Sequence, residues 1–291
     1  WYTTTYSRSG NGSSAVDSSA NAYIGDSYAI ITDGKGESQY RKIVGFTENS
    51  ITVDRPWDIT PDLTSTIVIT NAVENTVVYN NKIVGSKSYH LKYNASAGVQ
   101  AYATMLDYIA AENDFRNLFT GLFCNSHFNN RRLTSAKMGR GTHYADIQNS
   151  GFNWFEDTLI YNNTITNTRR GIDAQLSYSA DADITNGSNP ITVSHGIVIR
   201  NNIVDITKYV RNYIDSGIDI LAGIGGDGIA AGSLDKDYTV WNYNPLWQGD
   251  WIRDTLIENN KITNTVKASI GLYYHQANTM LRNNYCGGIT D

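Results

Sequence analysis

The chain has 291 residues, of which 41% are hydrophobic and only 18% are charged, and its formal net charge is -5. Asn, Thr, Ser, Gly and Tyr are abundant and only four prolines occur, a composition typical of an all-β protein with many polar turns. No basic run and no apolar stretch of about 18 residues is present. These absences argue against a nucleic-acid partner and against a membrane-spanning or membrane-bound chain.

Residues 1–70 differ in pattern from the rest of the chain. They contain short runs in which apolar and polar positions alternate, and turn-forming residues such as Asp33-Gly34 separate the runs. The candidate strands are 28–34, 40–46, 50–57 and 65–70. We expect an antiparallel, β-rich N-terminal segment that leads into the following structure and covers its exposed end.

Residues 71–291 repeat one phrase. The stretch DTLIYNNTITNT at 157–168 returns as DTLIENNKITNT at 254–265, with ten of twelve positions identical, and shorter versions lie between and around these two. Each version carries a marker asparagine between two apolar runs: Asn81, Asn113, Asn163, Asn202, Asn260 and Asn284. The shortest interval fits one coil of about 22 to 25 residues, and the longer intervals fit two coils or coils with insertions. The repeat predicts a solenoid with three short strands in each coil.

The repeat also predicts how the coils are built. Apolar residues such as Leu159, Ile165 and Ile172 should point inward, while equivalent strands of successive coils pair in parallel about 4.8 Å apart. An asparagine at a tight corner tolerates the left-handed backbone, and its amide can hydrogen-bond the asparagines above and below. We therefore assign a structural role to the marker asparagines.

The runs LIYNNTITNT followed by RRGIDAQ, and LIENNKITNT followed by VKASIGLYYH, resemble the repeats of right-handed parallel β-helix proteins of the pectate lyase and polygalacturonase type. This resemblance implies a secreted, carbohydrate-active right-handed parallel β-helix over residues 71–291, with loop insertions near 176–194 and 222–250. Of the polygalacturonase motifs only a fragment, SHG at 194–196, is present. The resemblance therefore implies the fold and a polysaccharide substrate, without fixing one activity.

The register of the repeat predicts one outward column of side chains. Aligning the run after Asn113 with the run after Asn163 places Phe123 beside Asp173. Placing both Ile218 and Ile270 in the column of Ile172 continues the alignment, with Gly271 pointing outward and Leu272 inward. The outward column then contains Phe123, Asn125, Asp173, Gln175, Asp219, Tyr273 and His275.

Asp173 and Asp219 are the candidate catalytic residues, with Asp215 in the preceding turn positioning water or tuning the pair. Two carboxylates on neighbouring coils cannot both ionise freely, so one would act as acid and the other as nucleophile or base in glycoside hydrolysis. The plainer alternative is that each aspartate is a solvated residue after a turn glycine.

The candidate sugar-binding residues are Gln175, Tyr273, His275, Trp247, Arg170 and Asn125. Aromatic rings stack on sugar faces, and an arginine binds a carboxylate or sulfate through two hydrogen bonds. Two structural alternatives apply: Trp247 covers apolar coil surface, and Arg170 forms a salt bridge with a nearby aspartate.

Three functions remain open from the sequence. The first is a glycoside hydrolase. The second is a polysaccharide lyase, in which carboxylates would bind calcium, and the third is a non-catalytic carbohydrate-binding or adhesive module. Apart from this calcium alternative, no cofactor and no metal site is predicted, because the histidines and acids show no metal-ligand spacing. We expect a monomer, since the sequence carries no trimer-forming signature.

Overall fold

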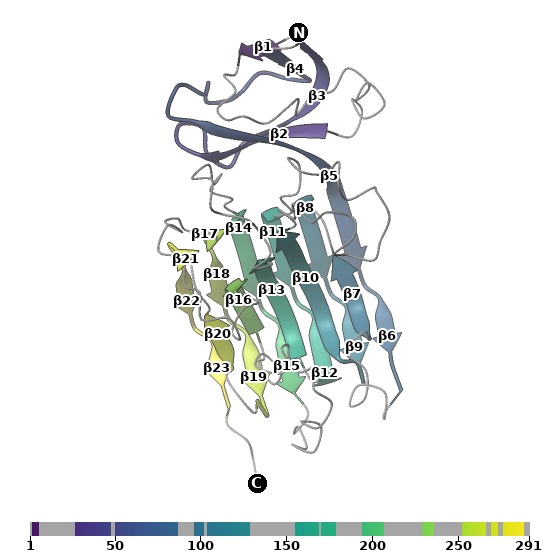
Figure 1. Ribbon diagram of the computed structural model, residues 1–291. Coiled ribbons are helices and arrows are strands. Elements are labelled where there is room, and N and C mark those ends of the chain that lie inside the picture. Colours follow the sequence, from purple (N-terminus) through teal and green to yellow (C-terminus); the bar gives the residue numbers. More distant parts are fainter. Residues whose placement is uncertain are drawn as a thin grey trace, which may run out of the picture.

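The computed structural model describes residues 2–5, 27–47, 50–86, 96–101, 104–128, 155–168, 170–178, 194–206, 229–235, 252–265, 269–272 and 276–287. Every regular element in these ranges is a β-strand. The all-β class predicted from composition is therefore confirmed for the described part of the chain. The strands form a small antiparallel sheet and three parallel sheets (Figure 1).

The N-terminal sheet is antiparallel. Its strands are β1 (Tyr2–Thr5), β2 (Ser27–Asp33), β3 (Tyr40–Thr47) and β4 (Ser50–Val53), in the order β1-β4-β3-β2. The first part of β5 (Thr66–Tyr79) pairs antiparallel with β2, and its second part pairs in parallel with β8. The N-terminal sheet is thus joined to the parallel sheets by a shared strand and not by a linker.

Three parallel sheets make up the rest of the described structure. The first sheet contains β5, β8 (Thr104–Ala111), β11 (Phe155–Tyr161), β14 (Ser194–Arg200), β17 (Ile252–Arg253), β18 (Leu256–Glu258), β21 (Gln276–Ala277) and β22 (Met280–Arg282). The second contains β6 (Lys82–Val84), β9 (Asp114–Arg116), β12 (Thr164–Thr168), β15 (Ile203–Ile206), β19 (Lys261–Thr263) and β23 (Tyr285–Cys286). The third contains β7 (Ala97–Ala101), β10 (Thr120–Phe128), β13 (Arg170–Tyr178), β16 (Ile229–Asp235) and β20 (Ile270–Leu272).

The chain passes through the first, second and third sheet in turn and then starts again, so each coil takes its strands from the three sheets in this order; in the last two coils the first sheet contributes two short strands, β17 and β18, then β21 and β22. Successive coils stack side by side in Figure 1. This strand order and the parallel pairing are compatible with a β-helix.

The core consists of columns of like residues from successive coils. Ile165 of the second sheet stacks between Phe115 and Val204, and all three are fully buried. Ile172 of the third sheet is also buried, as the sequence predicted. Leu159 is the exception: it is only half-buried, and its neighbour Ile160 occupies the core column instead. Side chains of a strand alternate between its faces, so Leu159 points away from the core.

The two asparagines of each NN pair have different roles. The first takes the left-handed backbone, as in Asn162 and Asn201, whose φ angles are 54° and 56°. The second builds the amide ladder, in which Asn163 Nδ2 donates to Asn202 Oδ1 at 3.0 Å. The ladder is continuous through Asn81, Asn113, Asn163, Asn202, Asn260 and Asn284. The predicted ladder is confirmed, but the left-handed corner belongs to the preceding residue.

A second left-handed position recurs within the first sheet. Its members, all with positive φ, are Asn75, Asp107, Asp157, Gly196, Asp254 and Asn278. Asp and Asn tolerate this backbone better than most residues, which explains why they recur at this position. The repeated aspartates of the DTLI phrases therefore belong to the scaffold, as the sequence predicted.

Candidate functional site

The structure confirms the register predicted for part of the column, although Asp173 in this column is buried. Phe123 pairs with Asp173 and Asn125 pairs with Gln175, in the register predicted from the repeat. The partner of Ile172 on the next coil is Ile229, however, so the residue beside Asp173 is Ala230. The prediction that Asp219 shares the column of Asp173 is therefore wrong. The insertion after β15 is long and precedes a second, similar Gly-Ile segment. The alignment based on the repeat alone therefore used the wrong one.

Asp173 does not form a carboxylate pair with another described acid. It is 1% exposed, and its Oδ2 accepts a hydrogen bond from Arg170 Nη1 at 2.9 Å. Arg170 is also buried and lies over the Phe119 ring, 5.3 Å from its centroid. The salt bridge anticipated as the structural alternative for Arg170 is thus present. A carboxylate that is both buried and bonded to an arginine is not placed to contact a sugar.

The last described strand of the third sheet keeps the predicted register. Ile270 pairs with Ile229 and therefore continues the column of Ile172. Leu272 continues the inward column of Ala174 but is 45% exposed, because β20 is the final strand of this sheet in the described residues. Asp215, Asp219, Trp247, Tyr273 and His275 lie outside the described residues, as do the side chains of Asn125 and Gln175.

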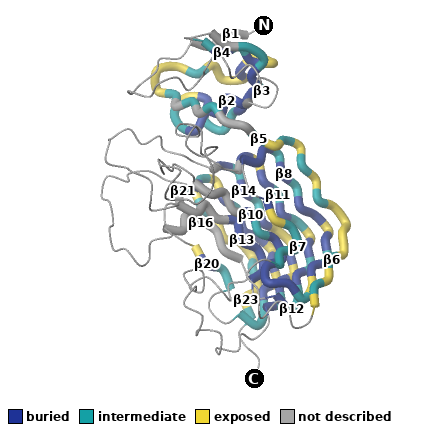
Figure 2. The backbone as a smooth tube through the Cα atoms, turned by 45° about the vertical axis from the view of Figure 1, so that its right-hand side comes forward, coloured by how far each residue is buried: buried dark blue, intermediate teal, exposed yellow. Residues whose placement is uncertain are grey.

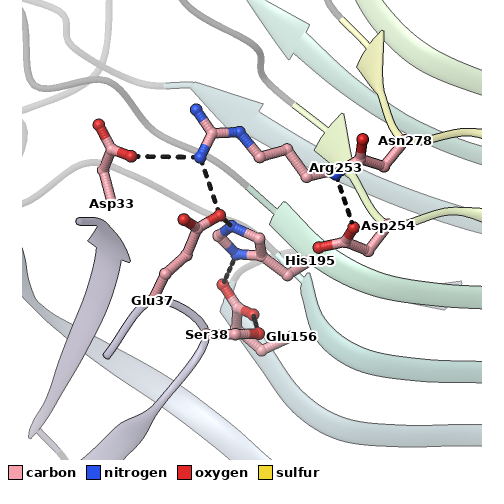
Figure 3. A network of polar contacts seen from close by, with 8 residues as sticks. All are labelled: Asp33, Glu37, Ser38, Glu156, His195, Arg253, Asp254 and Asn278. Carbon is pink, nitrogen blue, oxygen red and sulfur yellow. Dashed lines mark hydrogen bonds and ion pairs between the residues drawn. The ribbon is translucent and has the colours of Figure 1, made fainter. Parts of the chain in front are cut away.

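A different cluster of polar residues forms where the N-terminal sheet meets the parallel sheets. Glu156, His195 and Arg253 are neighbours in one column of the first sheet, on β11, β14 and β17. The turn after β2 brings Glu37 and Ser38 against this column, as Figure 3 shows. We call the five residues the junction network.

His195 lies at the centre of the junction network. Its Nε2 is 2.6 Å from Glu37 Oε1, and its Nδ1 is 3.1 Å from Glu156 Oε1. Ser38 Oγ donates to the other oxygen of Glu156 at 3.1 Å. Arg253 Nη1 donates to Glu37 Oε1 at 2.8 Å (Figure 3). Every side chain of the network therefore contacts at least one other member.

Burial changes the acid–base properties of this network. Glu156 is fully buried, which raises the pKa of its carboxyl to about 7, although hydrogen bonds from His195 and Ser38 oppose the shift. Burial alone would lower the pKa of His195, but its hydrogen bonds and the charges of Glu156 and Glu37 outweigh burial and raise it. Glu156 therefore titrates near neutral pH, and His195 holds its proton more tightly than an ordinary histidine.

The network is closed at one end and open at the other. Glu156 and His195 have at most 1% exposed side chains, whereas the Glu37 side chain is 30% exposed. Glu156, His195 and Glu37 are the kinds of groups that transfer protons in active sites. The network also connects the N-terminal sheet to three coils.

The sequence prediction missed this network although the repeat contains a signal for it. Glu156, His195 and Arg253 each directly precede one of the left-handed residues Asp157, Gly196 and Asp254. Three ionisable residues at one position of successive repeats indicate a polar column on one face. The contribution of Glu37 was not predictable in this way, because it comes from the antiparallel N-terminal sheet.

No protein-family model, curated protein or solved structure matches this chain. Among the described residues, no group of three or more His, Cys, Asp or Glu side chains is arranged to hold a metal ion. The same part of the chain contains no helix with the length and apolar character needed to cross a membrane.

Proposed function

We propose that the chain is a secreted, polysaccharide-binding protein of the right-handed parallel β-helix type, resembling pectate lyases and polygalacturonases in its repeats. The third sheet is the proposed binding surface. The observation that carries the proposal is its register, in which Phe123 stands beside Asp173 and Asn125 beside Gln175. Two amide residues at one level of successive coils suit hydrogen bonds to a polymer of similar units.

Binding is favoured over hydrolysis at this surface because Asp173 is buried. Its side chain is 1% exposed and bonded to Arg170, and the neighbouring coils place Phe123 and Ala230 beside it, so it does not present the pair of carboxylates that glycoside hydrolysis requires. We propose that Asn125 and Gln175 hydrogen-bond the sugar hydroxyl groups. Trp247, Tyr273 and His275 remain proposed contacts from the adjoining segments.

Binding can be tested on a panel of soluble polysaccharides and a glycan array. The double variant Asn125→Ala, Gln175→Ala should bind the recognised glycan at least tenfold more weakly than the wild type. Thr164→Ala on the second sheet is the control and should bind normally. Unchanged binding by the double variant, or the absence of binding to every glycan, would refute this proposal.

Glycoside hydrolysis is a second candidate, supported by the junction network and not by Asp173. Glu156 has a pKa of about 7 and therefore retains a proton near neutral pH, as a general acid must. Glu37 is a second carboxyl, separated from Glu156 by the imidazole of His195. The imidazole fills the space between the two carboxyls, so a substrate would meet the network at the partly exposed Glu37.

Hydrolysis is tested by measuring new reducing ends, with ultraviolet absorbance of unsaturated products as the sign of a lyase. Under the hydrolase proposal, Glu37→Gln should lower the release of reducing ends by about 100-fold or more. Asp173→Asn and Asp219→Asn test the aspartate pair predicted from the sequence. Activity that depends on these aspartates and not on Glu37 would contradict a catalytic junction network.

A further inference from the structure

Both ends of the stack of coils expose residues that belong to core columns. At the last coil, Leu281 is 47% exposed, although Ile257 beside it in the same column is fully buried. Cys286 is exposed as well, and it continues a buried column of the second sheet. At the first coil, Val78 and Ile83 begin the same two columns and are only partly buried. Figure 2 shows the edge that carries β6 as largely exposed. A stack of repeats needs its end repeats covered, so each end is a candidate contact surface.

The N-terminal sheet lies along one side of the stack. Tyr40 of β3 donates a hydrogen bond to Asp107 of β8. Glu37, in the turn after β2, contacts His195 of β14 and Arg253 of β17. In Figure 1 the N-terminal sheet lies above the coils, while β6 and β7 lie at one end of the stack and β20 and β23 at the other. In the part of the chain that the structure describes, these four strands are therefore edge strands of the second and third sheets.

The asparagine ladder has a direction. At each step the backbone N and the side-chain Nδ2 of one marker donate to Oδ1 of the marker on the following coil, as Asn260 does to Asn284 at 3.0 Å in both bonds. Asn81, on the first coil, uses both donors on Asn113, and its own Oδ1 accepts no bond from a described residue. On the last coil, Asn284 Nδ2 donates to Ile257 O at 2.7 Å, and its backbone N bonds to no described residue. One end of the ladder thus presents an acceptor and the other end presents donors.

We propose that the last coil of one copy of the chain binds the first coil of a second copy, so that the coils continue in register from chain to chain. The backbone N and Nδ2 of Asn284 then donate to Oδ1 of Asn81 of the second copy, which extends the ladder by one step. Two first coils would bring acceptor against acceptor at this position, and two last coils would bring donors against donors. Hydrogen-bond complementarity therefore selects the partner, which must carry the same coil, and the head-to-tail order.

Backbone groups beside the ladder support the same arrangement. Within the stack, the residue before each marker donates its backbone N to the following coil, and the residue after each marker donates to the preceding marker's carbonyl; these bonds are 2.8 to 3.2 Å long. At the last coil the corresponding groups are Asn283 N and Asn284 O, which no described coil follows. Register directs them to Tyr79 O and Lys82 N of the second copy. The contact therefore forms by addition of a strand to an exposed edge.

Packing at the contact repeats the packing between coils. Leu281 would lie on Val78 of the second copy and Cys286 on Ile83, so two core columns continue across the contact. The two surfaces differ, and each added copy leaves the same two free ends, so copies add in a line and do not close into a pair. The structure thus leads us from the monomer expected from the sequence to an open-ended, concentration-dependent assembly. This inference does not depend on the proposed glycan binding.

Sedimentation velocity over a range of protein concentrations tests the contact. The wild type should form a series of species larger than a dimer as its concentration rises. Val78→Arg blocks the first coil and Leu281→Arg blocks the last, because each buries an unpaired charge in the contact. Each variant alone should stay monomeric at concentrations at least tenfold above those at which the wild type assembles. Their equimolar mixture should form dimers and nothing larger, because only one free end of each kind remains.

The control for the blocked ends is Ile203→Arg, which changes an exposed residue in the middle of the stack and should assemble like the wild type. A wild type that stays monomeric at every concentration would overturn the proposal. Dimers of either blocked variant by itself would show that like ends meet, which contradicts the head-to-tail order.

Cysteine cross-linking tests the order of the copies in a nearly native chain, in which Cys286 is exposed and Cys124 is buried. In the proposed contact, residue 286 of one copy lies beside residue 83 of the next, at the spacing of about 4.8 Å between paired strands, which a disulfide can bridge. Ile83→Cys should therefore form a ladder of covalent oligomers under mild oxidation. The wild type and the double variant Ile83→Cys, Cys286→Ser should remain uncrosslinked.

Each of the other cross-linking results contradicts one part of the proposal. No ladder from Ile83→Cys would mean that the two ends do not meet. A covalent dimer of the wild type would place two last coils together, and a covalent dimer of the double variant would place two first coils together.

Discussion

At the scale of single residues, the marker asparagines stabilise the stack by satisfying buried backbone groups. Asn202 Oδ1 accepts hydrogen bonds from both the backbone N and the side-chain Nδ2 of Asn163, at 2.8 and 3.0 Å. Its own Nδ2 donates to Ile160 O at 3.0 Å. An apolar residue at this position would leave several of these groups without partners inside the protein.

We therefore predict that Asn202→Ala lowers the free energy of unfolding by about 3 kcal/mol or more, since each buried group without a partner costs about 1 to 3 kcal/mol. Asn284→Ala is the matched control at the end of the ladder. Asn284 is only half-buried, so water can replace its hydrogen bonds and the loss should be smaller. Urea denaturation compares the two variants, and equal losses would show that the ladder adds little to stability.

Glu156 and His195 give a second residue-scale prediction, which concerns pH. Both have pKa values raised by folding, Glu156 from 4.5 to about 7, so the folded protein holds protons that the unfolded chain releases. Their contribution to stability is complete below the ordinary pKa values and is lost as pH rises through the raised ones. The melting temperature should therefore decrease between about pH 5 and pH 8 through these two groups.

Glu156→Gln isolates the carboxyl contribution, because glutamine keeps the shape and does not titrate. The decrease in melting temperature with rising pH should be shallower in this variant than in the wild type. Glu74→Gln is the control: it makes the same change in the same column, two coils away. A variant with the wild-type slope would show that Glu156 does not titrate in this range.

At the scale of elements, close approach between neighbouring strands limits which residues fit. A Cβ added to Gly121 of β10 would lie 2.6 Å from Ile165 Cγ2 and 2.9 Å from the Gly171 carbonyl oxygen on the next coil. Real Cβ atoms do not approach other atoms this closely, so β10 would have to move away from the core and from β13. Glycine at this position is required by packing and not by backbone conformation.

Gly121→Ala should accordingly destabilise the protein by about 1 to 3 kcal/mol, as expected for overpacking of a core. Gly45→Ala on β3 is the control, because its added Cβ would lie 3.7 Å from the nearest atom, an ordinary contact. Thermal unfolding of the two variants measures the difference. A Gly121→Ala protein as stable as Gly45→Ala would mean that the strands separate at little cost.

At the scale of the whole molecule, the N-terminal sheet and the coils share one core. Side chains on one face of β2, Tyr28 and Ile30, belong to the same buried cluster as Met105 and Leu106 of β8. The other face of β2 packs within the N-terminal sheet, where Ala29 and Ile31 contribute to a separate cluster. Together with the junction network, this shared core couples the two parts, which are joined by β5 in Figure 2.

The shared core predicts one cooperative unfolding transition. Ile30 is fully buried, so Ile30→Ala should lower the free energy of unfolding by about 2 to 5 kcal/mol and should lower the melting temperature of the coils as well as that of the N-terminal sheet. Differential scanning calorimetry measures both effects. Two separate transitions, with only one shifted by the substitution, would contradict this coupling.

The sequence by itself determined the repeat, because each coil must match its neighbours in length and in side-chain size. The marker asparagines, the core positions of Ile165 and Ile172, and the pairing of Phe123 with Asp173 all followed from that constraint. Local periodicity carries this information because parallel strands repeat their contacts from coil to coil.

Only the tertiary structure decided which residues meet across the repeat. The sequence placed Asp219 beside Asp173 because the insertion after β15 contains a similar Gly-Ile segment, whereas the folded chain uses Ile229. It also placed Leu159 inside, although the alternation of faces along β11 directs Thr158 and Ile160 to the core and Leu159 outward. The contact of Glu37 with His195 joins residues 158 positions apart, and no periodic pattern specifies such a contact, since it depends on how two sheets dock.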